Sequence, residues 1–258
     1  MDLQHIRVER RDDHITDVVL DRPPVNALDE RFIEELDAVA GHLADAGRTR
    51  VVVLSSAHDA FMVGADLNMM DRGWDHVRSM IQSFQRAVNR WERIPSPTIA
   101  LLGGHALGAG CELALACDWI YASTKARFGQ PEVNLGLVPG FGGTSRLVRR
   151  VGPAWAKELV LSGEPIDAET ALRIGLANRV FEPEALVDAA VAAGETIAKK
   201  GPIAVALAKR VMQEGQGADL HVANALEQQA FGLVFASADR AEGMDAFLER
   251  RDPRFEGR

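Results

Sequence analysis

The chain has few cysteines and no excess of positive charge, and each shortage excludes a class of protein. Two cysteines, Cys111 and Cys117, stand among 258 residues, too few for the disulfide framework of a small secreted domain. Six positions apart on one helix, they would point in different directions and form no bridge. The formal net charge of −8 argues against a nucleic-acid partner, which needs a basic surface.

Long apolar runs are also missing. The first residues, MDLQHIRVERRDD, are charged and contain no apolar segment typical of a signal peptide. No uncharged apolar stretch reaches the length of about 20 residues that crosses a bilayer. We therefore expect a cytoplasmic protein with no membrane partner. With 47% hydrophobic residues, the chain can bury the full core of an ordinary globular protein.

Alternating strand-like and helix-like segments predict an α/β fold with mostly parallel strands. Residues 5–10 and 15–21 alternate apolar and polar side chains, as paired strands do, and Asp29 is placed to cap a helix after them. Residues 50–56 and 97–104 contain the continuous apolar runs of buried strands. We also expect a helix over 74–94, a helix that carries Glu112, and strands at 118–123 and 126–129.

From about residue 183 the strand patterns stop, and three or four amphipathic helices follow. This change predicts two units. We expect residues 1–195 to form an α/β core with the active site, and residues 196–258 to form a helical domain.

One acid stands among small and apolar residues in GHALGAGCELALACD, residues 104–118. Glu112 follows a glycine-rich turn and falls in the first turn of the predicted helix, where backbone N–H groups lack acceptors. If the helix begins near residue 108 or 109, the N–H of Ala109 and the carboxylate of Glu112 face one cavity. Taken alone, this pattern favours an acid that complements the helix dipole over a catalytic carboxylate.

The same glycines partly imitate a dinucleotide-binding loop. Gly108 and Gly110 supply two glycines of that fingerprint, and Glu132 follows at a suitable distance, but Leu113 takes the place of the third glycine. The segment also lies in the middle of the chain. A nicotinamide-dependent oxidoreductase is therefore the weaker alternative.

Two more segments have features of a site. In FGQPEVNLGLVPGFGG, Pro131 suits the start of a helical turn and puts Glu132 just inside it, and the later glycines, Gly140 among them, indicate special backbone angles or a close ligand. In AFMVGADLNMM, Gly64 and Ala65 are small enough for a ligand to approach the backbone. Two acids, each beside a glycine-rich element, suggest a paired acid/base site.

Five segments together resemble the enoyl-CoA hydratases of the crotonase superfamily, nearly from end to end. They are NALDERFIEELDA, FMVGADL, GGHALGAGCELALACD, ARFGQPEVNLGLVPGFGGTSRLVRRVG and EGMDAFLERRDPRF. The resemblance implies a crotonase-type spiral of β-β-α units with a C-terminal helical oligomerisation domain. In the family that domain builds homotrimers, often paired as homohexamers, and the apolar helices after residue 196 need a partner surface.

The resemblance also implies a reaction, the addition of water across the C2=C3 double bond of a trans-2-enoyl-CoA to give a 3-hydroxyacyl-CoA. By motif, the backbone N–H groups of Ala65 and Ala109 form an oxyanion hole for the thioester oxygen, where each donor can contribute about 3–4 kcal/mol. Glu112 would activate the water that attacks C3, and Glu132 would donate a proton to C2. Coenzyme A enters as part of the acyl-CoA substrate, and we expect no metal and no separate cofactor.

Further motif residues are expected to contact the acyl-CoA. Relatives often carry a lysine where this chain has Asn68, and often a glycine where it has Ala109. The last residues resemble a tail that reaches the CoA of a neighbouring subunit. The expected substrate contacts are Val25, Ala27, Gly64, Asp66, Leu67, Asn68, Gly110, Pro131, Gly140, Arg251 and Phe255.

Other uses of this site stay open on the sequence alone. Superfamily relatives also move double bonds, or hydrate an aromatic enoyl-CoA and then cleave the product, but the presence of both acids favours hydration. RNA binding, reported for some relatives, would need a lysine-rich helix face, and the net charge of −8 opposes it. Acyl-chain length, branching and aromaticity are not indicated by the residues.

Overall fold

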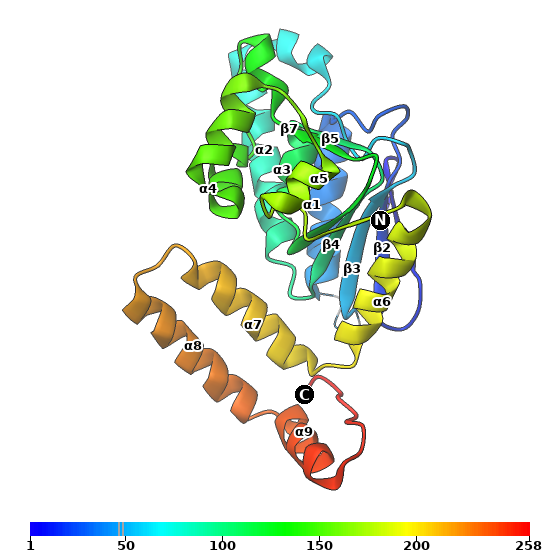
Figure 1. The fold of residues 1–258 in the computed structure, drawn as a ribbon, viewed down its shortest axis with the longest axis vertical. Helices are drawn as coiled ribbons and strands as arrows, with labels where there is room; N and C mark the ends of the chain where they lie inside the picture. The colour runs from blue at the N-terminus through cyan, green and yellow to red at the C-terminus, as the bar shows by residue number, and fades with distance from the viewer. Residues whose placement is uncertain (46, 48) are drawn as a thin grey trace.

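A six-stranded sheet forms the centre of the molecule in the computed structural model, which describes residues 1–45, 47 and 49–258 (Figure 1). The strand order is β1-β2-β3-β4-β6-β9. The first pair is antiparallel and the other four pairs are parallel, so the predicted hairpin and the predicted parallel core are confirmed. The strands are β1 (Ile6–Arg10), β2 (Ile15–Leu20), β3 (Val51–Ser56), β4 (Thr98–Leu102), β6 (Trp119–Ser123) and β9 (Arg179–Phe181).

A second, three-stranded sheet carries the segments that hold the two predicted catalytic acids. β5 pairs in parallel with β7, and β7 pairs antiparallel with β8. Because β5 leads into α3 and β7 leads into η2, this pairing brings the chain near residue 108 beside the chain near residue 130. The elements are β5 (His105–Leu107), α3 (Ala109–Leu115), β7 (Arg127–Gly129), the 3-10 helix η2 (Pro131–Leu135) and β8 (Ile166–Asp167).

Helices cover both faces of the large sheet. Val52 and Leu54 of β3 belong to the main apolar cluster with α1 and α2, whereas Val51 and Val53 pack in a second cluster with α6. Each such side chain contributes about 1.5–3 kcal/mol by full burial. The covering elements are α1 (Glu30–Asp45), η1 (Leu67–Arg72), α2 (Trp74–Glu92), α4 (Gly143–Ser162, bent at Gly152), α5 (Ala168–Arg173), η3 (Pro183–Ala185) and α6 (Leu186–Ala198).

Three further helices, here called the helical extension, leave the base of the core (Figure 1). They are α7 (Pro202–Gly215), α8 (Leu220–Phe235) and α9 (Ala238–Glu249), and α7 packs along α8. The predicted division at residue 195 falls inside α6, which contacts β2, β3, β4 and β6. By these contacts the extension starts after α6; its independence as a domain stays a prediction. Over the described residues, each helix is too short or too polar to cross a membrane.

Candidate active site

Glu112 lies in the first turn of α3 and is completely buried, with 0% of its surface exposed. Its Oε1 accepts hydrogen bonds from the backbone N–H groups of Phe141 (2.8 Å) and Gly143 (2.7 Å). These donors stand at the start of α4, where Gly142 has φ 107°, a conformation that favours glycine. The loop therefore supplies two fixed donors to one carboxylate oxygen.

The second oxygen of Glu112 is in a different situation. Oε2 is buried and has no hydrogen-bond partner within the described part of the chain. Burial raises the pKa of Glu112 from 4.5 to about 7, against the lowering effect of the bonds from Gly143 and Phe141. One oxygen is thus held in place, and the other is free to take up a proton.

Glu132 lies in the first turn of η2 and is partly buried. Burial raises the pKa of its carboxyl group above the ordinary value. The charge of Glu132 also contributes to the raised pKa of Glu112, so the two carboxyl groups are electrostatic neighbours. A methyl group built on Gly108 would lie 2.9 Å from Oε1 of Glu132. The carboxyl group of Glu132 therefore lies close to Gly108, the residue that precedes α3.

Two glycines with positive φ precede the two predicted oxyanion donors. Gly64 has φ 108° and Gly108 has φ 53°, and these angles orient the following peptide groups, which carry the N–H of Ala65 and of Ala109. A methyl group built on Gly108 would lie 3.6 Å from Cα of Gly64. The two donor segments, which are far apart in the sequence, therefore lie side by side.

Both donor N–H groups lack an acceptor in the part of the chain that the structure describes. The bridge between Leu28 and Ala65 uses Gly64 O and Asp66 N, at 2.9 and 2.8 Å, which leaves the N–H of Ala65 on the other side of its segment. Ala109 is the first residue of α3, so its N–H has no helical acceptor. The predicted pair of donors is thus brought together, while its use as an oxyanion hole stays a prediction.

Gly110 has a packing role that accounts for its lack of a side chain. A methyl group built there would lie 2.1 Å from the carbonyl oxygen of Met62. Any larger residue would push α3 away from the segment that continues to Gly64 and Ala65. Direct contact of Gly110 with a substrate stays a prediction.

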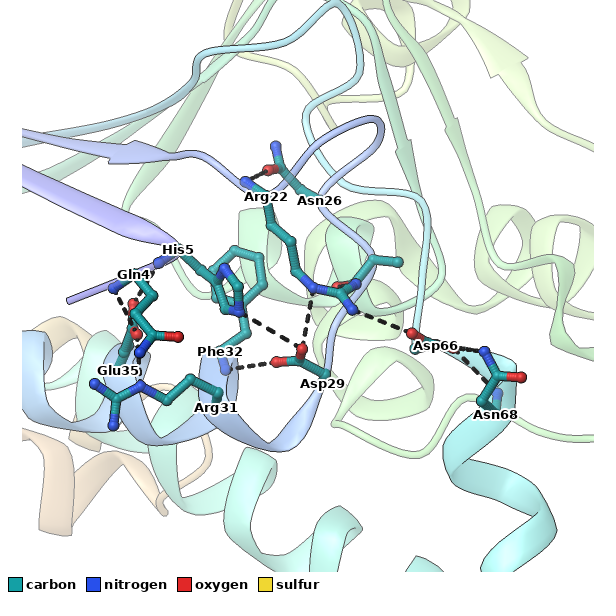
Figure 2. Close-up of polar contacts among 11 residues, drawn as sticks. Gln4, His5, Arg22, Asn26, Asp29, Arg31, Phe32, Glu35, Asp66 and Asn68 are labelled. Carbon is teal, nitrogen blue, oxygen red and sulfur yellow. Dashed lines mark hydrogen bonds and ion pairs between the residues drawn. The ribbon is translucent and has the colours of Figure 1, made fainter.

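Asp66 and Asn68 bind each other and the neighbouring loop (Figure 2). Asp66 accepts hydrogen bonds from the backbone N–H (3.1 Å) and side-chain amide (2.8 Å) of Asn68. Arg22 pairs with Asp66 (3.2 Å) and Asp29 (3.0 Å). The N–H of Asn68 and then Arg22 lower the pKa of Asp66. Asp29 also accepts the N–H of Phe32 (2.8 Å), which confirms the predicted cap of α1.

The turn that carries Val25 and Ala27 is fixed against the donor segment. Asn26, with φ 54° and 0% exposed, donates through its amide to Phe61 O and to Ser56 Oγ, both at 2.8 Å. Val25 O accepts the N–H of Val63 at 3.3 Å. Val25 and Ala27 are therefore partly buried next to residues 61–65, and their contact with CoA stays a prediction.

Three other predicted contact residues lie on η1, on η2 and on the glycine loop. Leu67 is 56% exposed at the start of η1. Pro131 is the first residue of η2, as its ring favours. The carbonyl of Gly140 accepts a hydrogen bond from Gln85 at 2.7 Å, which ties the loop to α2. Their contacts with substrate stay predictions.

Arg251 and Phe255 do not lie with the two acids in one chain. Arg251 pairs with Glu242 (2.6 Å) and Glu249 (2.6 Å). Phe255 packs near Gly201 and Gly243, and its carbonyl accepts a bond from Arg50 at 3.3 Å, just before β3. The donor segments follow the other end of β3. The prediction that this tail reaches a neighbouring subunit's CoA therefore stays a prediction.

Sequence reasoning missed several residues that build the site. It identified the glycine loop but not the N–H groups of Phe141 and Gly143 as the partners of Glu112. It also missed Gln130, which contacts Glu132, and Arg22. The available signal was the run PGFGG immediately before a helix, because a left-handed residue there turns backbone donors toward a neighbour. Over the described residues, no group of three or more His, Cys, Asp or Glu side chains could hold a metal ion.

Comparison with known proteins agrees with this geometry. The chain matches the enoyl-CoA hydratase/isomerase family over residues 10–258. It is 39% identical over 254 residues to a short-chain-enoyl-CoA hydratase of Clostridium acetobutylicum, and the match covers 97% of both chains. It is 40% identical over 248 residues to a crotonyl-CoA hydratase of Syntrophomonas wolfei, and that match covers 95% of both chains. The crystal structure of an enoyl-CoA hydratase from Bacillus anthracis superimposes with a TM-score of 0.96 at 38% identity, covering 99% of this chain and 100% of that one. The predicted crotonase-type fold is confirmed, and the chain belongs to the enoyl-CoA hydratase/isomerase family.

Proposed function

We propose that this chain works as an enoyl-CoA hydratase through a two-glutamate mechanism, with Glu112 as the general base and Glu132 as the general acid. The observation that carries the proposal is the unequal environment of the two oxygens of Glu112. Oε1 is fixed by two backbone donors, Oε2 is buried without a partner in the described structure, and the charge of Glu132 acts on the same carboxyl group. A carboxylate held in this way can orient a water molecule and accept its proton.

The reaction builds negative charge on the thioester oxygen when water attacks C3 of the substrate. The N–H groups of Ala65 and Ala109 are preorganised to stabilise that charge, because their backbone is fixed before the substrate binds. Glu112 takes the proton of the attacking water as the C3–O bond forms. Glu132 gives its proton to C2, and proton exchange with solvent then returns both acids to their starting states.

The raised pKa values suit these two roles. A carboxylate with a pKa of about 7 is a stronger base than an ordinary glutamate and is still ionised in a large fraction of molecules near neutral pH. Burial raises the pKa of Glu132, which favours the protonated form that an acid catalyst needs. Each glutamate thus matches the task proposed for it.

The substrate class is a trans-2-enoyl-CoA, and no separate cofactor or metal ion takes part. Names of the relatives support this class, since two of them refer to short-chain enoyl-CoA and crotonyl-CoA hydration. We propose that the CoA portion lies along Val25, Ala27 and Leu67, beside the donor segment. The free, buried thiols of Cys111 and Cys117 suit a reducing compartment such as the cytoplasm.

A homotrimer, or a hexamer of two trimers, is the proposed assembly. The helical extension exposes large apolar side chains, with Phe231 70% and Phe247 83% exposed. Apolar surface of this kind marks an interaction site. In such an assembly Arg251 and Phe255 could approach the CoA site of a neighbouring copy. Light scattering after gel filtration tests the assembly directly, and a monomer at micromolar concentration would refute it.

Hydration of crotonyl-CoA, followed by loss of the enoyl-thioester absorbance, tests the proposed reaction. We expect wild-type activity, and a fall of about 10²–10⁴-fold in kcat for Glu112→Gln and for Glu132→Gln. Gln85→Met removes the hydrogen bond between α2 and Gly140 O and leaves both acids in place. The change in its kcat therefore measures how much of the loss comes from a loosened loop. Inactivity of wild type on crotonyl-CoA and on longer or aromatic enoyl-CoAs would exclude the hydratase function.

A further inference from the structure

Arg146 lies near the start of α4, directly after the glycine loop (residues 139–143) that holds Glu112. Its side chain is only 12% exposed, and the mechanism above gives it no task. The Nε, Nη1 and Nη2 atoms of its guanidinium group all donate hydrogen bonds to other residues. A planar cation fixed by several partners is suited to hold those partners in one arrangement.

On one side, Arg146 holds the backbone of the glycine loop. Its Nη1 donates to the carbonyl oxygen of Phe141 at 3.1 Å, and its backbone N–H donates to the carbonyl oxygen of Gly142 at 2.8 Å. The N–H of Phe141 and the N–H of Gly143 are the two donors to Oε1 of Glu112. Because Gly142 O and the Gly143 N–H belong to one peptide group, Arg146 fixes the backbone beside both donors.

The guanidinium group also fills the space in which a side chain at position 142 would lie. A methyl group built on Gly142 would lie 2.1 Å from Nη1 of Arg146. Gly142 has φ 107°, so the loop needs glycine for its backbone angle as well. The guanidinium group therefore packs directly against the backbone of the glycine loop.

On the other side, Arg146 is attached to α2. Its Nη2 donates to Asn89 Oδ1 at 2.6 Å and to Glu92 Oε2 at 2.8 Å, and its Nε donates to the same oxygen of Glu92 at 3.3 Å. The two partners are three positions apart and lie on one face of the helix. Glu92 is the last residue of α2, and its carbonyl oxygen accepts the amide of Gln213 in α7 at 2.8 Å. Arg146 is therefore attached to a helix end that is itself held in place.

The charge of Arg146 also acts on the proposed base. Burial raises the pKa of Glu112 to about 7, and the charge of Glu132 adds to this increase. The two N–H donors and the positive charge of Arg146 act in the opposite direction. On the side of α2, Glu92 pairs with Arg146 at 2.8 Å. Loss of Arg146 would thus raise the pKa of Glu112 further, because the cation is removed and the donors are loosened.

We propose that Arg146 is the positioning residue of Glu112, and that its guanidinium group holds the glycine loop against α2 and so fixes the carboxylate oxygen that the loop binds. This inference rests on the proposed role of Glu112 as the general base. Arg146 itself touches no reacting atom and transfers no proton. It acts through the N–H groups of Phe141 and Gly143.

Arg146→Met tests the role, because methionine keeps an unbranched side chain but removes the N–H donors and the charge. We expect kcat for crotonyl-CoA hydration to fall about 10–100-fold with KM within about threefold, as a displaced catalytic group predicts. The acidic limb of the pH profile of kcat/KM should move up by about half a pH unit or more, because the pKa of Glu112 rises. In the folded variant, an unmoved acidic limb would overturn the proposal, and so would wild-type kcat.

Arg150→Met is the matched control, since it makes the same substitution one turn further along α4. The guanidinium group of Arg150 donates to three residues outside the glycine loop: Asp118 O (3.2 Å), Leu176 O (3.4 Å) and Asn178 Oδ1 (2.6 Å). This variant should have a lower Tm but wild-type kcat and an unmoved acidic limb. Equal shifts of the limb in both variants would overturn the proposal, because they would report general damage to α4.

A double-mutant cycle adds a readout that a purely structural role would not satisfy. In a Glu112→Gln background, Arg146→Met should reduce kcat no further, because the carboxylate that it positions is absent. A full additional loss would count against the positioning role and overturn it. If Glu112→Gln alone keeps full activity, the general-base assignment has failed, and not the role of Arg146 alone.

Arg146→Lys decides the question if the methionine variant does not fold. Lysine keeps a positive charge beside Glu92, but one ammonium group does not replace the planar fork that serves Glu92, Asn89 and Phe141 together. We expect a folded enzyme with kcat about fivefold or more below wild type and with KM within about threefold. Wild-type kcat in this variant would overturn the proposal.

Discussion

The α/β core and the helical extension differ in how far they bury their phenylalanine side chains. Phe32 and Phe84 in the core are both 0% exposed, whereas Phe231 and Phe247 in the extension are 70% and 83% exposed. The core thus buries these rings within its own packing, and its fold positions the site. The extension leaves its apolar surface open, as one half of an interface does.

Polar contacts help to attach the extension to the core. Lys209 of α7 pairs with Asp118 at 2.7 Å and donates to Ser96 O at 3.1 Å. Gln213 adds its bond to Glu92 O at 2.8 Å. The contrast shows how one chain can keep a rigid site in one region while reserving apolar surface in another for a partner. Four measurements test this difference between the two regions.

The largest effect is expected from the same substitution made in a helix of each region. Gly110→Ala places a methyl group 2.1 Å from Met62 O, so we expect a loss of about 3 kcal/mol or more in the free energy of unfolding. Gly232→Ala in α8 meets nothing within 4 Å and should gain about 0.5–1 kcal/mol. Urea unfolding measures both. Equal effects at the two positions would contradict the difference in packing.

Breaking the polar attachment should come next in size. Lys209→Met leaves the carboxylate of Asp118 without its cation, and we expect a loss of about 3 kcal/mol in the free energy of unfolding. Lys209 is 6% exposed. The neighbouring Arg210 forms an exposed pair with Glu214 at 2.9 Å, so Arg210→Met should change the free energy by less than about 1 kcal/mol. A similar loss for both variants would show that burial of the pair is unimportant.

The buried carboxyl group of Glu112 should make the stability of the core sensitive to pH. The pKa of Glu112 is about 7 in the folded chain and ordinary when unfolded, so the folded state binds more protons between about pH 4.5 and 7. Stability from this group is therefore present at low pH and lost as pH rises through that window. Glu112→Gln should be more stable than wild type by about 3 kcal/mol at pH 8, with the difference vanishing near pH 4. A constant difference from pH 4 to 8 would contradict the buried-carboxylate explanation.

The smallest effect on folding is expected in the extension. Phe247→Ser removes an 83% exposed ring, so the free energy of unfolding of a single chain should change by less than about 0.5 kcal/mol. Assembly should weaken instead, with subunits separating at protein concentrations where wild type stays associated. Sedimentation velocity over a dilution series measures this. A large loss of single-chain stability would mean that the ring packs within its own chain.

Sequence patterns predicted the long, regular elements because their periodicity is local. β3 has four consecutive apolar residues from Val51 to Leu54, and α1 has both its cap and its apolar spacing in the sequence. β5, β8 and β9 have three, two and three residues and carry no periodicity. They form because distant segments meet, so one-dimensional patterns do not reveal them.

The site likewise has parts that local sequence predicts and parts that depend on distant segments meeting. Glu112, Glu132 and the small residues of the donor segments were predicted because the motifs contain them. The partners of the acids were not, because they depend on tertiary approach: Phe141 and Gly143 reach Glu112 across 29 and 31 positions in the chain. Gln130 was overlooked for another reason. Its neighbour Glu132 is two positions away, but an amide beside a carboxyl becomes meaningful only when both are known to be enclosed.

The two glycines with positive φ, Gly64 and Gly108, have a consequence for the evolution of the site. Each turns a peptide N–H inward, and every residue except proline carries that group. The side chains that follow, at Ala65 and Ala109, can therefore vary in size without removing a donor. Under the proposed function, selection can reshape the space around the donors one substitution at a time while the proposed means of activating the thioester is inherited unchanged, provided that the glycines themselves are kept.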